Sequence, residues 1–86
     1  MSYRIEVSRT ARRGLDGLPP EVRQRVVLRI DALADGPRQH GVEALKGPYK
    51  GLHKLRIGEY RVILHIDDQQ GTVAVLRVGH RRSVYR

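Results

Sequence analysis

Residues 53–66, H-K-L-R-I-G-E-Y-R-V-I-L-H-I, largely alternate between apolar and polar side chains on both sides of a central Gly-Glu pair. Alternation with a period of two is typical of β-strands that are buried on one face. Gly58 supplies the backbone freedom that a tight connection between two strands needs. The stretch therefore predicts a β-hairpin whose strands cover residues 52–57 and 60–66.

The same period continues after the hairpin and is interrupted before it. Residues 72–78, T-V-A-V-L-R-V, predict a third strand, and the turn D-D-Q-Q-G at 67–71 joins it to the hairpin. Residues 38–51 contain three glycines and one proline, a composition that predicts a loop. Near the N-terminus, residues 3–7, Y-R-I-E-V, alternate again and predict a short strand.

Two segments between the first strand and the loop have apolar residues at helical spacing. Residues 11–18 predict a short helix, which Ser8 or Thr10 can cap. Residues 21–35 predict a longer helix, which follows a Pro-Pro pair and ends at a Gly-Pro pair. The order β-α-α-β-β-β predicts one α+β domain over residues 1–86, with the helices on one face of a small antiparallel sheet.

The charge of the chain is strongly and unevenly basic. The formal net charge is +8, and fourteen of the seventeen basic residues are Arg. Residues 1–43 carry eight Arg and six acids, whereas residues 44–86 carry nine Lys or Arg and three acids. A basic half indicates a polyanionic partner, most often nucleic acid, and the planar guanidinium group suits phosphate.

Composition also narrows the compartment and the chemistry. The chain has no cysteine, so a disulfide framework and a thiolate metal site are excluded. No apolar run approaches the length of a membrane span, and the start M-S-Y-R-I lacks the apolar core of a signal peptide. These observations predict a cytoplasmic protein with no membrane partner.

Strand parity predicts which side chains share a face of the sheet, because successive side chains point to opposite faces. The set expected under the helices is apolar: Leu55, Ile57, Val62, Leu64, Ile66, Ala74, Leu76 and Val78. The set expected on the open face is basic: Lys54, Arg56, Arg61, Arg77 and, by extending the last strand, Arg81. Solvated arginine on an exposed strand is ordinary, but agreement between three strands favours a cationic binding surface.

The chemistry open to such a surface does not require a metal or another cofactor, and none is expected. The four histidines have no ligand-like spacing, and the chain has no Gly-rich phosphate loop. RNA carries its own nucleophile, the 2′-hydroxyl, so a protein can cleave it by aligning that group and stabilising charge on the phosphate. Proton transfer then needs a side chain such as His or Lys.

Three segments resemble the RelE/ParE superfamily of toxins from toxin–antitoxin pairs: L-K-G at 45–47, the hairpin 53–66, and V-G-H-R-R-S-V-Y at 78–85. The resemblance covers nearly the whole chain. It implies a RelE-like fold. For RelE-type members it also implies an endoribonuclease that cuts mRNA in the ribosomal A site without metal, by attack of the 2′-hydroxyl on the adjacent phosphate.

The resemblance also implies roles for particular residues. Lys54 matches a site lysine, Arg61 is expected to brace the scissile phosphate, and Arg81 to stabilise the transition state or protonate the leaving group. Tyr85 is expected to orient or stack on a nucleotide. The remaining basic residues expected to bind RNA are Lys50, Arg56, Arg77 and Arg82.

One position departs from the family pattern. RelE-type sites often carry a second lysine two residues before the position of Lys54, and this chain has Leu52 there. Lys50 can substitute only if the loop curls inward, and His80 is the other candidate for proton transfer. The identity of the general base stays open, and Tyr3, Tyr49 and Tyr60 are interpreted as packing residues.

Three other functions compete with the nuclease. A ParE-type member would share the fold and poison DNA gyrase. A non-catalytic module would bind RNA or the ribosome without cutting, and a degraded toxin would serve only in a repressor complex. The partners implied by the resemblance are a cognate RelB-like antitoxin, in a hetero-oligomeric complex, and mRNA on the ribosome.

Overall fold

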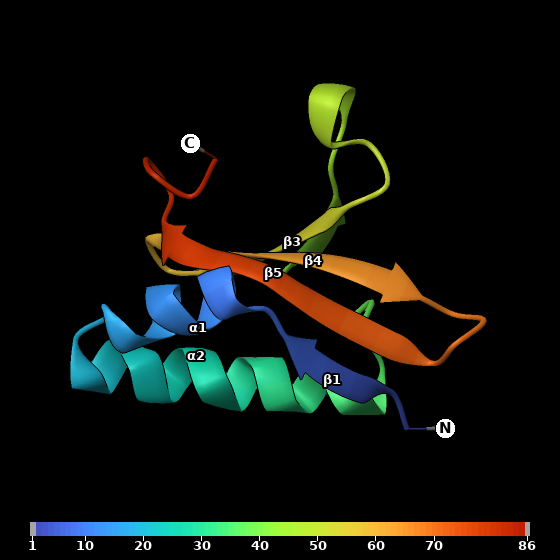
Figure 1. Cartoon of the computed structure of the whole chain (residues 1–86), viewed down its shortest axis with the longest axis horizontal. Helices are drawn as coiled ribbons and strands as arrows, with labels where there is room; N and C mark the ends of the chain where they lie inside the picture. Colours follow the sequence, from blue (N-terminus) through green and yellow to red (C-terminus); the bar gives the residue numbers. More distant parts are fainter. Residues whose placement is uncertain (1, 86) are drawn as a thin grey trace.

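A computed structural model describes residues 2–85, which form two α-helices and a five-stranded sheet (Figure 1). In chain order the elements are β1 (Arg4–Val7), α1 (Arg9–Asp16), α2 (Pro20–Ala32), η1 (Leu33–Asp35), β2 (Val42–Ala44), η2 (Gly47–Tyr49), β3 (His53–Ile57), β4 (Tyr60–Asp67) and β5 (Thr72–His80). The helices η1 and η2 are single 3₁₀ turns. None of the helices within residues 2–85 is long and apolar enough to cross a membrane.

The strand order is β1-β5-β4-β3-β2, and α1 and α2 lie together on one side of the sheet (Figure 1). The prediction of an α+β domain with both helices on one face is confirmed. The prediction of a purely antiparallel sheet is wrong, because β1 pairs with β5 in parallel. The loop prediction for residues 38–51 also missed β2, which pairs antiparallel with β3. Both pairings depend on partners that no local sequence pattern identifies.

The helix starts follow from local chemistry. Ser8 caps α1: its hydroxyl accepts a hydrogen bond from the backbone N–H of Ala11 at 3.0 Å and donates one to the carbonyl of Leu76 at 2.9 Å. The same side chain therefore begins the helix and ties it to β5. Pro20 occupies the first turn of α2, where a missing N–H has no cost.

A bulge in β5 changes which residues reach the core. Ile63 pairs with Arg77, whereas the next residue, Leu64, pairs with Val75, so Leu76 is the extra residue. A shift of one residue exchanges the two faces of a strand. Val73 and Val75 are accordingly fully buried in the core, and the predicted placement of Ala74 and Leu76 under the helices is wrong.

The remaining core follows the predicted parity. Leu55, Val62 and Val78 are neighbours in the register across three strands, and all three are buried under the helices. Val26 and Ile30 of α2 are buried against the same cluster. The sheet thus has one face covered by helices and one face without them, which is called the open face below.

An exposed cluster around Asp68 ties three distant segments together. Arg38 donates two hydrogen bonds to the Asp68 carboxylate, at 2.9 and 3.0 Å, and the Tyr3 hydroxyl donates a third at 2.6 Å. Hydrogen bonding by Arg38 and then by Tyr3 lowers the pKa of Asp68 to about 2. The ionised form of this carboxylate therefore stabilises the fold.

We expect this cluster to make stability sensitive to acid. Because the pKa of Asp68 is lower in the folded chain than its ordinary value of 3.8, its contribution is present above pH 4 and is lost as the pH falls towards about 2. Thermal melts from pH 5 to pH 2 measure this loss. Asp68→Asn should flatten the melting temperature in that window, and an unchanged pH profile in the variant would contradict the assignment.

Candidate nucleic-acid interface

Two rows of side chains cross the open face of the sheet. Lys54 of β3, Ile63 of β4 and Arg77 of β5 are direct neighbours in the register. One step towards the β3–β4 turn, Arg56 is directly opposite Arg61. The structure therefore brings these four basic residues onto one face, as the strand parity of β3 and β4 predicts. Like charges placed directly opposite each other on a sheet are destabilising without a counter-charge.

Backbone carbonyls hold Arg61 in place. Its Nη1 donates to the carbonyl oxygens of Gly58 at 2.8 Å and of Tyr60 at 2.9 Å, both beside the β3–β4 turn. The side chain is half-buried. One end of the guanidinium group is thus anchored on the hairpin, and the group retains further N–H donors for a phosphate.

Lys54 has an acidic neighbour that strand parity did not predict. Glu43 of β2 is directly opposite Lys54, on the same open face. Glu43 lies in the segment for which the sequence predicts a loop. Its position beside the basic rows depends on the pairing of β2 with β3, which only the tertiary structure reveals. Lys54 is half-buried, whereas Glu43 is exposed.

The C-terminal segment does not continue as a strand to Arg81. Strand β5 ends at His80, and residues 81–85 form turns. The backbone N–H of Arg81 donates to the carbonyl of Glu59 at 2.9 Å, and its Nε forms an ion pair with the Glu59 carboxylate at 2.9 Å. Arg81 therefore lies at the end of the sheet, next to the turn that also anchors Arg61. Parity alone did not place it there.

His80 lies apart from the basic rows. It pairs in the register with Tyr60, and the two rings meet edge to face with centroids 5.7 Å apart. Tyr60 packs against the core under the helices. The Nδ1 of His80 accepts a hydrogen bond from the backbone N–H of Arg82 at 3.2 Å. The structure thus gives His80 a contact on the helix side of the sheet.

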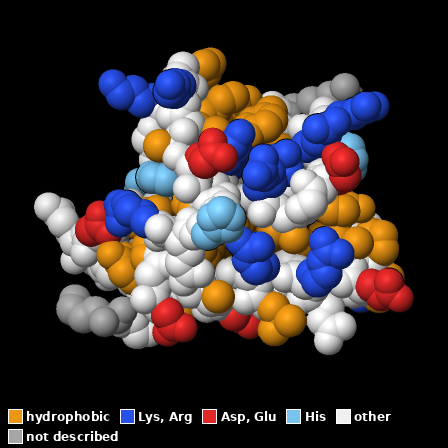
Figure 2. Space-filling model, turned by 180° about the vertical axis from the view of Figure 1, so that it is seen from behind, with side chains coloured by type: hydrophobic (Ala, Val, Ile, Leu, Met, Phe, Trp, Pro, Cys, Tyr) orange, Lys and Arg blue, Asp and Glu red, His pale blue; other side chains and the backbone are white. Residues whose placement is uncertain are grey.

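An apolar pocket of about 240 Å³ lies on the open face beside the row of Lys54 and Arg77. Its lining residues come from the loop around η2, the strands β4 and β5 and the C-terminal turns: Tyr49, Leu52, Ile63, Leu76, Arg77, Val84 and Tyr85. Figure 2 shows Lys and Arg side chains around an apolar area at the end of the molecule where η2 and the C-terminal segment lie. The candidate site therefore combines an apolar pocket with Lys and Arg side chains around it.

Two of the residues that line this pocket are tyrosines that contact each other. The Tyr49 hydroxyl donates to the carbonyl of Tyr85 at 2.9 Å, and the ring centroids are 5.3 Å apart. Tyr49 was interpreted as a packing residue, yet its side chain is 36% exposed. The sequence pattern that could have identified Tyr49 as a site residue is an aromatic side chain within a basic loop segment, K-G-P-Y-K.

The other positions that the sequence analysis singled out lie either in the pocket or at the solvent-exposed surface. Leu52, where the family pattern has a second lysine, lines the apolar pocket. Lys50 and Arg82 are exposed. Neither residue lines the pocket, and neither belongs to a strand. Within residues 2–85, His, Asp and Glu side chains do not gather in groups of three that could hold a metal ion.

Comparison with known proteins gives the same family from sequence and from structure. The family described as "ParE toxin of type II toxin-antitoxin system, parDE" matches residues 5–85. Toxin RelG of Mycobacterium tuberculosis is 38% identical over 87 residues, which cover 100% of this chain and 99% of that protein.

Two crystal structures share the fold. The toxin–antitoxin complex RelBE2 of Mycobacterium tuberculosis matches with a TM-score of 0.84 and 35% identity, over 94% of this chain and 100% of the other. The archaeal RelE–RelB complex of Pyrococcus horikoshii matches with a TM-score of 0.80 and 26% identity, over 98% and 100%. The chain therefore belongs to the RelE/ParE superfamily of toxins from type II toxin–antitoxin systems.

Proposed function

We propose that the protein is the toxin of a toxin–antitoxin module and that it cleaves mRNA in the A site of the ribosome. The observation that supports the proposal is the pair of basic rows on the open face, Lys54 with Arg77 and Arg56 with Arg61. These rows lie beside an apolar pocket that is lined by two tyrosines in contact with each other. Guanidinium groups suit the phosphate, and aromatic rings suit an unstacked base.

The reaction class follows from the chemistry of RNA. The 2′-hydroxyl loses its proton and its oxygen attacks the adjacent phosphorus, while the bond to the 5′-oxygen breaks and that oxygen takes up a proton. The products are a 2′,3′-cyclic phosphate and a 5′-hydroxyl. Donors held in advance of the reaction stabilise the negative charge that builds up on the phosphate.

Each basic residue has a place in this scheme. Arg61, anchored at the β3–β4 turn, binds the scissile phosphate, and Arg81 approaches the leaving oxygen from the same end of the sheet. Lys54, in the next row, assists proton transfer from the 2′-hydroxyl. Arg56 and Arg77 hold flanking phosphates, with Lys50 and Arg82 as exposed contacts at the rim.

The pocket positions the nucleotide. Tyr85 stacks on a base, and Tyr49 holds Tyr85 through its hydroxyl and ring. His80 contributes from behind the active surface, because it orients the C-terminal turn through the N–H of Arg82 and the edge of Tyr60. Its role in the proposed reaction is positional.

The proposed partner follows from the relatives. The two crystal structures above are complexes of RelE-type proteins with RelB antitoxins. We propose a RelB-like antitoxin for this chain as well, in a hetero-oligomeric complex in the cytoplasm. Its binding would prevent the basic surface from meeting mRNA.

Primer extension on a defined mRNA in a purified translation system tests the proposal. Wild-type protein should produce cuts at A-site codons. Arg81→Ala should remove most of them, because a charge beside the leaving oxygen is lost; the expected decrease in rate is about 100-fold. Arg9→Ala, an exposed change on α1, is the matched control and should cut at the wild-type rate.

Other outcomes would identify the competing functions. Intact mRNA with stalled ribosomes would indicate a binding module without catalysis. Intact mRNA with normal translation, together with gyrase-dependent DNA breaks, would identify an inhibitor of the ParE type.

A further inference from the structure

The turn between β3 and β4 holds two of the arginines that are proposed to act on the RNA. Gly58 has a φ of 57° at the first of the two central positions, which fits a type II′ hairpin turn. The carbonyls of Gly58 and Tyr60 accept hydrogen bonds from the Arg61 guanidinium group at 2.8 and 2.9 Å. The carbonyl of Glu59, between them, accepts the backbone N–H of Arg81 at 2.9 Å. Three successive carbonyls therefore anchor both arginines at the same turn.

Glu59 makes a further contact, and this one reaches the charged group of Arg81. Its carboxylate forms an ion pair with the Nε of Arg81 at 2.9 Å, and the Arg81 and Glu59 side chains are 50% and 63% exposed. An ion pair this exposed adds little to the free energy of unfolding. Its consequence is one of orientation, because a contact at Nε fixes the direction of the planar guanidinium group.

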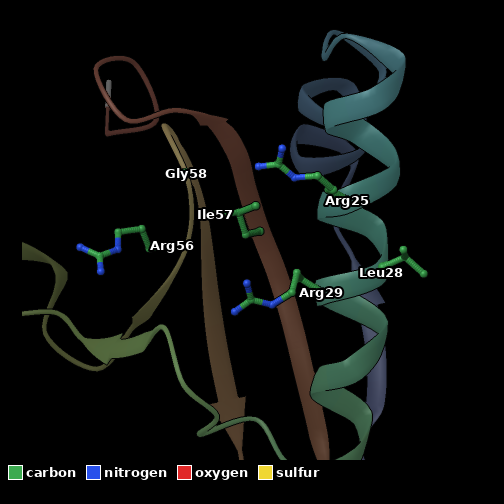
Figure 3. Close-up of a pocket in the computed structure, with 6 residues that line it drawn as sticks. All are labelled: Arg25, Leu28, Arg29, Arg56, Ile57 and Gly58. Atoms are coloured by element: carbon green, nitrogen blue, oxygen red, sulfur yellow. The ribbon is translucent and has the colours of Figure 1, made fainter.

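Another cation approaches the same turn from the helix side of the sheet. Figure 3 shows Arg25 extending from α2 towards the sheet, and Arg25 lines a pocket of about 290 Å³ together with Gly58. A Cβ atom at Gly58 would lie 3.5 Å from the Nη2 of Arg25. Within residues 2–85, however, Glu59 forms its ion pair with Arg81 and not with Arg25. The carboxylate is therefore committed to the arginine of the C-terminal turns.

We propose that Glu59 is a positioning residue for cleavage: its carboxylate holds the Arg81 guanidinium group so that the two terminal nitrogens face the leaving oxygen. The inference rests on the proposed function, in which Arg81 acts on that oxygen. The side chain of an arginine is long and flexible, and ordering it at the moment of reaction costs conformational entropy. Glu59 orders it in advance, which is what makes a donor effective in the transition state.

The opposite role is that of a brake, in which the carboxylate competes with the phosphate for Arg81. The geometry fits this role less well. The closest approach of the carboxylate is to Nε, and the edge formed by Nη1 and Nη2 lies on the opposite side of the guanidinium group. That edge offers the paired N–H donors that suit a phosphate. The contact with Glu59 therefore leaves the phosphate-binding edge of Arg81 available.

Single-turnover cleavage of a defined ribosome–mRNA complex by the full-length protein tests the inference. Glu59→Ala should lower the maximal rate about 10-fold, because Arg81 is then no longer held in its reactive geometry. The ribosome concentration that gives half the maximal rate should stay the same or fall, because the loss of an acid makes the surface more attractive to RNA. A general folding defect would not slow cleavage while leaving binding as tight as before.

Glu59→Gln is the matched variant. It removes the same charge as Glu59→Ala, but its amide oxygen can still accept a hydrogen bond from Nε, so it should recover most of the rate. Equal rates for the Gln and Ala variants would overturn the inference, because the effect would then be one of charge. Glu6→Ala is the control away from the site, since Glu6 is an exposed acid paired with Arg4 on the edge strand β1, and it should cut at the wild-type rate.

A double-mutant cycle determines whether Glu59 acts through Arg81. In an Arg81→Ala background, Glu59→Ala should change the rate by less than about twofold, because the contact is already absent. In an Arg25→Ala background, Glu59→Ala should slow cleavage as much as it does in the wild type. The same loss in both backgrounds would overturn the inference.

The remaining outcomes distinguish the inference from the proposed function. A wild-type rate for Glu59→Ala would overturn the inference and leave the proposed function intact. Faster cleavage by Glu59→Ala would also overturn it and would identify the carboxylate as a brake. Absence of cleavage by the wild-type protein would refute the proposed function and the inference with it.

Discussion

Arg61→Ala is expected to slow mRNA cleavage on the ribosome by about 10²- to 10³-fold, the effect typical of removing one preorganised donor to a developing negative charge. Arg61 is selected because its guanidinium group is already held by two backbone carbonyls at the β3–β4 turn. A donor that needs no reorganisation at the moment of reaction contributes most to the transition state. Single-turnover cleavage of a defined ribosome complex measures the effect.

Two controls separate geometry from charge. Arg61→Lys keeps the positive charge but loses the planar fork, and it should recover only part of the rate. Arg4→Ala removes a charge from β1, where Arg4 pairs with Glu6, and should leave the rate unchanged. Equal rates for wild type and Arg61→Ala would remove Arg61 from the proposed mechanism, and equal melting temperatures would show that the change is not one of folding.

Gly14→Ala is expected to destabilise the fold by about 3 kcal/mol, a large fraction of the stability of a small domain. A Cβ atom at Gly14 would lie well under 3.0 Å from the carbonyl oxygen of Val78 and 3.3 Å from the Cβ of the same residue. The nearest obstacle is backbone of a central strand, which cannot rotate away. Helix α1 must therefore move off β5, which would strain the hydrogen bond from the Ser8 hydroxyl to the Leu76 carbonyl. Urea denaturation measures the change.

Gly17→Ala is the matched control for that result. An added Cβ there would meet carbonyl oxygens at 3.6 and 3.7 Å, which are ordinary contacts. Gly17 has a φ of −80°, a conformation that alanine adopts freely. The variant should be neutral or more stable by about 0.5 kcal/mol, through the unfolded state. If both variants are equally stable, the close approach of α1 to β5 is wrong.

The sequence alone was sufficient for the elements that local chemistry determines. Period-two alternation identified β3, β4 and β5, helical spacing identified α1 and α2, and the parity of Lys54, Arg56 and Arg61 predicted a shared face. Each of these features depends on side chains that are close together in the chain. The family motifs added the expected roles of Arg81 and Tyr85.

Only the tertiary structure decided the features that depend on distant partners. The bulge at Leu76 reverses the faces of the first half of β5, and no residue in that strand signals it. The short strand β2 exists only because β3 offers a pairing edge, and that pairing puts Glu43 beside Lys54. Tyr49 meets Tyr85 across 36 residues of chain. Hydrogen-bond register and loop closure are properties of the assembled sheet, so a pattern confined to one strand cannot contain them.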